Sequence, residues 1–192
     1  MNAWDIDVLT RDVNDFWFGA PGSDGFGVAQ EKWFTKDLAL DAEIKQRFEG
    51  AIEAGGHGRL DVMAETPLGA LALVVLLDQF SRNVYRDTAR MFENDAHALT
   101  IAEAAIGRGF DLAVKPVMRP FFYLPYEHSE DLAHQEVALE KFAALGGEPL
   151  VWAQKHADII KRFGRFPHRN AALGRASTAE ETAFLEEPGS SF

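Results

Sequence analysis

The residues best suited to chemistry gather near the end of the chain, in the stretch KRFGRFPHRN at residues 161–170. The stretch combines arginines and a histidine with two phenylalanines, in a protein whose net charge is −11. An arginine guanidinium donates two parallel hydrogen bonds to a carboxylate or phosphate, so this composition suits an anion-binding site. We predict that Arg162, Arg165, His168 and Arg169 line a groove that binds a small anionic ligand or a peptide.

The same stretch also has a purely structural interpretation. Lys161 and Arg162 fall in the last turn of a predicted helix, where cations interact favourably with the C-terminal end of the helix dipole. Gly164 can form a left-handed cap there, and Pro167 prevents the helix from resuming. In this interpretation the arginines stack on the phenylalanine rings and pair with acidic side chains of the protein.

A second arginine-rich turn is DQFSRNVYR, residues 78–86. Asp78 ends an apolar helix, where a carboxylate is costly to desolvate unless a cation pairs with it. Arg82 and Arg86 are the nearest candidates, and the structural interpretation is a salt-bridge network that ties the middle helices to the late ones. In the functional interpretation the two arginine-rich turns pack against each other and form the main anion-binding site.

A third polar group is YEHSED, residues 126–131. His128 and Glu130 have the residue types of a general acid/base pair, because histidine titrates near neutral pH. The structural alternative is a helix capped by Ser129, with acidic residues in its first turn. With His134 these residues lack the spacing that places two imidazoles on one helix face, so we predict no metal site. We assign no catalytic residue and expect no cofactor.

Helical spacing dominates the elements that must position these residues. Apolar residues recur at three and four from Ile6 to Trp17 and at every fourth position from Leu40 to Ile52. Thr66-Pro67 starts a helix whose apolar run, 68–77, is half the roughly 20 residues that a bilayer crossing needs, so we predict a buried central helix. Ser177 and Glu180 have the spacing of a capping box for a last helix.

No segment alternates polar and apolar residues as a strand does. The sequence therefore predicts an all-α fold of seven to eight helices, arranged as antiparallel helical hairpins in a single domain over residues 1–192.

Composition limits the partners and the compartment. The 30 acidic against 19 basic residues argue against nucleic acid and anionic membranes, which both require an extended basic surface. The chain has no cysteine, and its N-terminal stretch is acidic where a secretory signal is basic, so we predict a cytoplasmic protein.

Three stretches, residues 76–99, 124–131 and 156–185, closely resemble the bacterial domain-of-unknown-function family 924. The resemblance implies a helical fold similar to that of tetratricopeptide-repeat proteins, in a family without an assigned reaction. It supplies no catalytic residues for this chain.

We therefore predict a helical protein that binds a small anionic ligand or a peptide through an arginine-lined groove. A hydrolase or transferase acting on an anionic substrate is the first alternative. A protein-interaction module, in which the arginine network is purely structural, is the second. The distinguishing feature is whether His128 and His168 converge with the arginines in a concave pocket.

Overall fold

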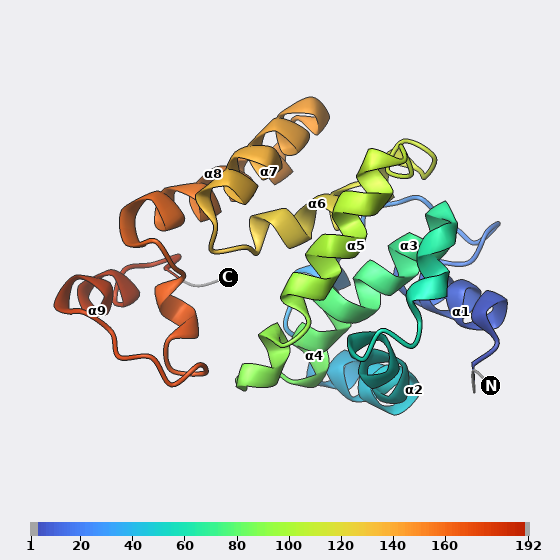
Figure 1. Cartoon of the computed structure of the whole chain (residues 1–192), viewed down its shortest axis with the longest axis horizontal. Helices are drawn as coiled ribbons and strands as arrows, with labels where there is room; N and C mark the ends of the chain where they lie inside the picture. Colours follow the sequence, from blue (N-terminus) through green and yellow to red (C-terminus); the bar gives the residue numbers. More distant parts are fainter. Residues whose placement is uncertain (1–3, 191–192) are drawn as a thin grey trace. The chain divides into compact units, whose positions relative to one another are not determined.

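The computed structural model describes residues 4–190, which form helices joined by turns and loops and contain no strand (Figure 1). The all-helical prediction is confirmed. The chain divides into two compact units, the first ending at Pro125 apart from Asp87–Ala89, which belong with the second. Each unit is described by itself, and the single domain over residues 1–192 stays a prediction.

The connections between helices range from the two residues between α7 and α8 to the 19 residues between α1 and α2. The α-helices are α1 (Ile6–Phe18), α2 (Leu38–Gly56), α3 (Pro67–Val74), α4 (Ser81–Val84), α5 (Asp95–Gly107), α6 (Pro120–Glu127), α7 (Leu132–Leu145), α8 (Glu148–Phe163) and α9 (Ala179–Leu185). Short 3-10 turns occupy Glu31–Trp33, Asp61–Glu65, Ala89–Phe92, Pro116–Met118 and Pro167–Arg169, and a π-helical segment occupies Val75–Phe80.

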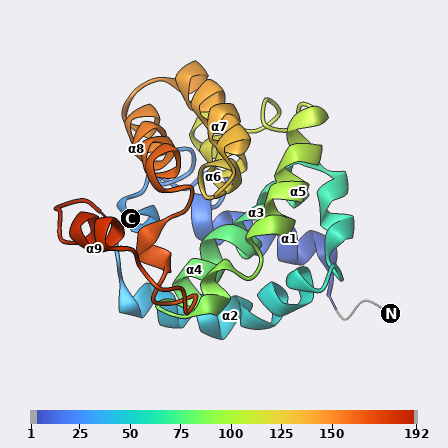
Figure 2. The same ribbon diagram turned by 60° about the vertical axis from the view of Figure 1, so that its left-hand side comes forward.

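One continuous helix, made of α3, the π-helical segment and α4, forms the centre of the first unit. The Thr66 side chain accepts a hydrogen bond from the Gly69 amide, and Pro67 takes the first helical position, as the sequence predicts. Residues 70–77 are fully buried. Helices α1 and α5 contact α3, while α2 lies along the π-helical segment and α4 (Figure 2). Counted as one, this helix brings the helices of residues 4–190 to eight.

Aromatic rings fill the space around the central helix. The ring of Phe80 lies 5.2 Å from Trp17 of α1 and 5.1 Å from Phe48 of α2, measured between centroids. Phe16 contacts the same Phe48 ring edge-on at 5.3 Å. Edge-on aromatic pairs add a directional contribution to the burial of apolar area, so they fix how these helices meet.

The second unit is built on the antiparallel hairpin of α7 and α8, which lie side by side in Figures 1 and 2. The turn between them contains Gly146 and Gly147, both at positive φ, where glycine has no Cβ to obstruct the backbone. Helix α8 ends at Gly164, which adopts the left-handed conformation and donates its N–H to the Ile160 carbonyl at 2.8 Å. This is the cap that the sequence predicts.

Two predicted helix starts are wrong. Asp131, rather than Ser129, caps α7, because the helix begins later than expected. The Asp131 carboxylate accepts a hydrogen bond of 2.8 Å from the Ala133 amide. At α9 the capping box is Thr178 with Glu181, one residue beyond the predicted pair of Ser177 and Glu180. Both pairs have the required spacing, and the choice is made by tertiary contacts, since Asn170 donates to the Ser177 hydroxyl.

The apolar run of α3 is a core element of the first unit. Within the described part of the chain, no helix combines the length and the apolarity that a membrane crossing requires.

Truncating the central helix should weaken the fold. Leu73→Ala or Leu76→Ala should lower the free energy of unfolding by about 2–5 kcal/mol, because each leaves a cavity in a fully buried site. Urea unfolding measures this loss. Leu112→Ala is the control, since Leu112 is 66% exposed and its truncation should change stability by less than about 0.5 kcal/mol. A similarly small change at both Leu73 and Leu76 would contradict the buried position of this helix.

Candidate functional site

Arg82 is held between two carboxylates of the first unit. Its guanidinium contacts Asp95 through two parallel hydrogen bonds of 2.9 and 3.0 Å, and it lies 3.1 Å from a carboxylate oxygen of Asp78. Asp78 has no exposed surface. Burial lowers the pKa of Arg82, but Asp78 and Asp95 outweigh this effect and raise it. The cation that the burial of Asp78 requires is therefore Arg82.

Arg86 is paired in the same way with α2. It donates two hydrogen bonds of 2.9 Å to the carboxylate of Asp41, which also accepts one from Asn83 at 2.7 Å. Asp41 lies in the first turn of α2. Arg82 and Arg86 thus tie α4 to α5 and to α2, which supports the structural interpretation of this turn.

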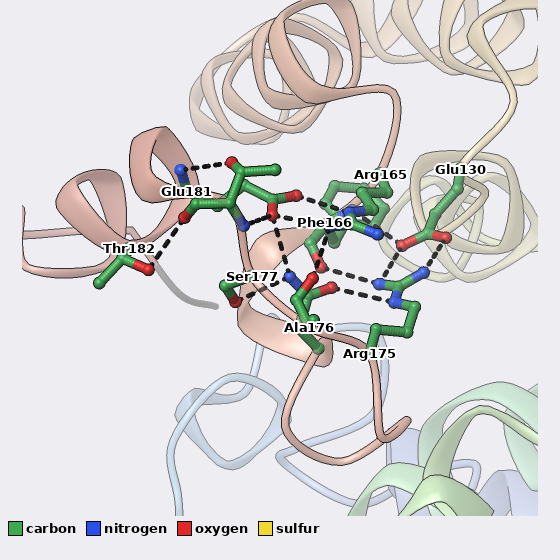
Figure 3. Close-up of polar contacts among 10 residues, drawn as sticks. Glu130, Arg165, Phe166, Arg175, Ala176, Ser177, Glu181 and Thr182 are labelled. Atoms are coloured by element: carbon green, nitrogen blue, oxygen red, sulfur yellow. Dashed lines mark hydrogen bonds and ion pairs between the residues drawn. The ribbon is translucent and has the colours of Figure 1, made fainter.

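In the second unit, Arg165 is engaged by a carboxylate of the last helix (Figure 3). Its guanidinium donates to both oxygens of Glu181, one of them at 2.7 Å, and also to the Ala176 carbonyl at 3.0 Å. Arg165 is the largest influence on Glu181 and, with the Thr178 amide, lowers the pKa of that carboxyl to about 2.

Glu130, just before α7, is likewise paired with an arginine. It accepts hydrogen bonds of 2.7 and 3.0 Å from Arg175 and one of 2.8 Å from the Phe166 amide (Figure 3). Burial raises the pKa of Glu130, but the hydrogen bonds from Arg175 and Phe166, with the nearby charge of Arg169, lower it overall. Glu130 is therefore held as an anion by Arg175.

Asn170 joins these two ion pairs into one network. Its side-chain oxygen accepts from Arg175 at 2.9 Å, and its side-chain nitrogen lies 3.4 Å from Glu181. A continuous network of hydrogen bonds thus runs from Glu130 through Arg175, Asn170 and Glu181 to Arg165. This arrangement fixes the turn after α8 against the start of α7 and against α9.

Arg162 also pairs with α9, but at the surface. It donates to Glu180 at 2.9 Å, and its guanidinium lies over the Phe163 ring at 4.6 Å from the centroid. Both charged side chains of the pair are largely exposed, at 45% and 64%. The pair therefore contributes little to stability.

A separate group of titratable residues surrounds His156, a buried residue of α8. The Nδ1 atom of His156 lies 2.9 Å from the Trp152 carbonyl and 3.1 Å from an oxygen of Glu127, which is also buried. Both partners only accept hydrogen bonds, so Nδ1 carries the proton and the basic nitrogen of the neutral ring is Nε2. Burial, followed by the positive field of His128, lowers the pKa of His156.

Three of the predicted site residues converge on this imidazole. The rings of His128 and His156 lie 6.2 Å apart, and Phe166 bridges His156 to His168 at 5.6 and 5.5 Å. The guanidinium of Arg169, itself buried, lies 4.4 Å from the centre of the Phe166 ring. The fields of Arg169 and His168 also lower the pKa of His156.

The structure thus separates the predicted residues into two sets. Arg162, Arg165 and Glu130 take part in ion pairs that position segments of the second unit. His128, His168 and Arg169 gather around His156 and form the candidate site. Arg82 and Arg86 belong to the first unit, and the packing of the two arginine-rich turns on each other stays a prediction.

Three functional candidates escaped the sequence analysis. Arg175 stands in a segment without helical spacing, and nothing in the sequence pairs it with Glu130. Glu127 and His156 lie on helical faces among apolar residues, where buried polar residues give no local signal. At the candidate site the carboxylate that contacts an imidazole is thus Glu127, whereas Glu130 binds Arg175 and His134 lies 2.8 Å from the Ser129 hydroxyl.

Comparison with protein families shows to which family the chain belongs. The model of a family of bacterial proteins of unknown function, DUF924, matches residues 13–189. The chain belongs to DUF924. The chain is also similar to a solved structure of a protein of unknown function from Agrobacterium tumefaciens, with 44% sequence identity and a TM-score of 0.87, over 95% of this chain and 99% of that one. No curated protein matches the chain.

The ion pair of Glu181 should make this DUF924 protein sensitive to acid. The pKa of the Glu181 carboxyl is about 2 in the folded state, against an ordinary value of 4.5. The stabilisation that the ion pair provides is therefore present above pH 4.5 and is lost as the pH falls towards 2. Glu181→Gln should lower the urea midpoint at pH 7 and weaken its decline between pH 5 and pH 3.

Glu186→Gln serves as the matched control for this experiment, because Glu186 is an exposed carboxylate at the end of the same helix. It should keep both the midpoint at pH 7 and the acid dependence of the unchanged protein. An acid dependence that is the same in Glu181→Gln as in the unchanged protein would disprove the role of this pair.

Proposed function

We propose that this protein binds a small anionic ligand, or an anionic group of a peptide, at the cluster of His128, His168 and Arg169 in the second unit. The observation that supports it is the grouping of His128 beside the buried imidazole of His156, and of His168 and Arg169 beside the Phe166 ring that packs on this imidazole. A carboxylate or phosphate brought there would meet a concentrated positive field in a protein that is strongly acidic elsewhere.

The neighbouring network gives this cluster a rigid frame. Phe166 donates its amide to Glu130 and accepts a hydrogen bond from Arg175 through its carbonyl, so the backbone just before His168 and Arg169 is fixed at both polar groups. The 3-10 turn Pro167–Arg169 follows directly. Such a backbone holds the side chains of His168 and Arg169 in place before a ligand arrives, which reduces the entropy lost on binding.

A hydrolase or transferase acting on an anionic substrate is the second candidate. It is favoured by the contact of 3.1 Å between Glu127 and His156, which leaves Nε2 as the basic nitrogen. An imidazole oriented by a carboxylate is the usual arrangement of a general base, but burial lowers the pKa of His156 to about 3 and makes it a weak base, so this candidate ranks below anion binding. In this alternative the cationic cluster binds the anionic part of the substrate beside the imidazole.

A protein-interaction module is the third candidate, and the engagement of Arg82, Arg86, Arg162 and Arg165 with carboxylates of the protein favours it. The α7–α8 hairpin, two helices joined through a two-glycine turn, supports a tetratricopeptide-like architecture for such a module. We further infer a cytoplasmic location from the acidic, cysteine-free composition.

Anion-dependent thermal stability tests the proposed function. Phosphate or citrate should raise the melting temperature in a saturable way, because a ligand that binds only the folded state stabilises it. At one hundred times the dissociation constant the gain is about 2.7 kcal/mol, or roughly 5–10 °C for a chain of 192 residues. Arg169→Lys and His168→Asn should each reduce this gain several-fold.

Arg165→Ala is the matched control. It removes a cation from the same turn, but one that Glu181 engages, so it should lower the melting temperature and leave the increment due to the anion unchanged. An equal increment in the unchanged protein, in Arg169→Lys and in His168→Asn would refute the site. If the increment fell only in Arg165→Ala, the anion would bind at the network instead.

A further inference from the structure

The first unit contains a cavity of about 650 Å³ that is lined by none of the candidate site residues described above. It lies between the first three turns of α1, the turn Asp61–Glu65 with the start of α3, and residues 113–118. A volume of this size suits a small molecule. Much of the wall is apolar, formed by Ile6, Phe26, Val62, Met63, Leu68 and Met118.

Asn14 of α1 supplies a buried acceptor in this wall. The side chain is 8% exposed, and its nitrogen donates to the carbonyls of Thr10 and Leu68 at 2.8 and 3.0 Å. These two hydrogen bonds fix the orientation of the amide, and its oxygen, Oδ1, is the remaining polar atom of the side chain. Within residues 4–190 nothing donates a hydrogen bond to this oxygen, which is buried. A buried acceptor without a donor is unfavourable, so the site favours a ligand that carries an N–H or O–H group.

The charges around the cavity select the sign of that ligand. Asp7 lies seven residues before Asn14, two turns along the same face of α1, and Asp15 also lines the cavity, whereas the third carboxylate of the wall, Glu65, is paired with Arg108 at 3.4 Å. The two cations of the wall already have other contacts. Lys115 lies over the Phe26 ring at 4.5 Å, and Arg11 lies 3.7 Å from Asp12. The wall therefore favours a positive charge over a negative one.

We propose that this cavity binds a small primary amine with an apolar chain. The chain lies against the apolar wall between α1 and α3, and the ammonium group donates a hydrogen bond to Oδ1 of Asn14 on the side of Asp7. This site differs from the proposed anion site in position, in the sign of the ligand and in its apolar character, so either can fail without the other.

Calorimetric titration with octylamine tests the proposal on the whole protein. Three comparison compounds separate its parts, because octanoate reverses the charge, octanol removes it, and trimethyloctylammonium keeps the charge but has no N–H donor. Octylamine should bind at least tenfold more tightly than each of them. Equal binding of octanoate or of trimethyloctylammonium would overturn the proposal, and so would the absence of octylamine binding.

Two pairs of variants place the ligand in the cavity. Ala113→Trp, which fills the cavity from an exposed wall position, should weaken octylamine binding at least tenfold, whereas Leu112→Trp at the adjacent exposed residue outside the wall should leave it unchanged. Asp7→Asn should weaken octylamine several-fold, and Asp24→Asn, at an exposed carboxylate of the loop after α1 that lies outside the wall, should not. Unchanged binding in both Ala113→Trp and Asp7→Asn would overturn the proposal.

Discussion

A buried carboxylate must be paired with a cation or with N–H groups, and this requirement determines how both units of the protein are organised. In the first unit it places Arg82 beside the fully buried Asp78, and in the second it places Arg165 beside Glu181. Acidic residues outnumber basic ones by 30 to 19, so the cations are the scarcer partners. Arg82, Arg86 and Arg165 accordingly lie where elements meet, and each pairs with a carboxylate of another helix.

This constraint gives the ion pairs a different role from that of the apolar core. Apolar contacts such as those around Phe80 draw the helices together without a strict direction, whereas a two-pronged contact between Arg86 and Asp41 sets the position of one helix along another. In the second unit the network through Asn170 does the same for the turn that follows α8. The cationic cluster beside His156 thus stands next to the most firmly fixed backbone of that unit.

The sequence predicts the helices well because their signals are local. The spacing of apolar residues and the pairs Thr66-Pro67 and Phe163-Gly164 mark helices and their ends within a few residues. It predicts the site less well, because the partners are distant in the chain: Glu130 and Arg175 are 45 residues apart, and Glu127 meets His156 across two elements. No spacing rule selects such pairs. The predicted capping box of α9 was wrong for the same reason, since tertiary contacts determine which of two equivalent local patterns forms.

The π-helical segment Val75–Phe80 has a consequence for how this chain can change in length. A π-helical turn holds an additional residue, and the wider turn absorbs the rotation of about 100° that this residue would add in a regular helix, so the helix after the segment keeps its phase. Arg82 and Arg86 follow it and reach Asp95 and Asp41 from that position. Loss of one residue here would convert the π-helical turn into a regular α-helical one and leave Arg82 and Arg86 on the face that reaches Asp95 and Asp41. The chain can therefore lose a residue in this segment without losing these ion pairs.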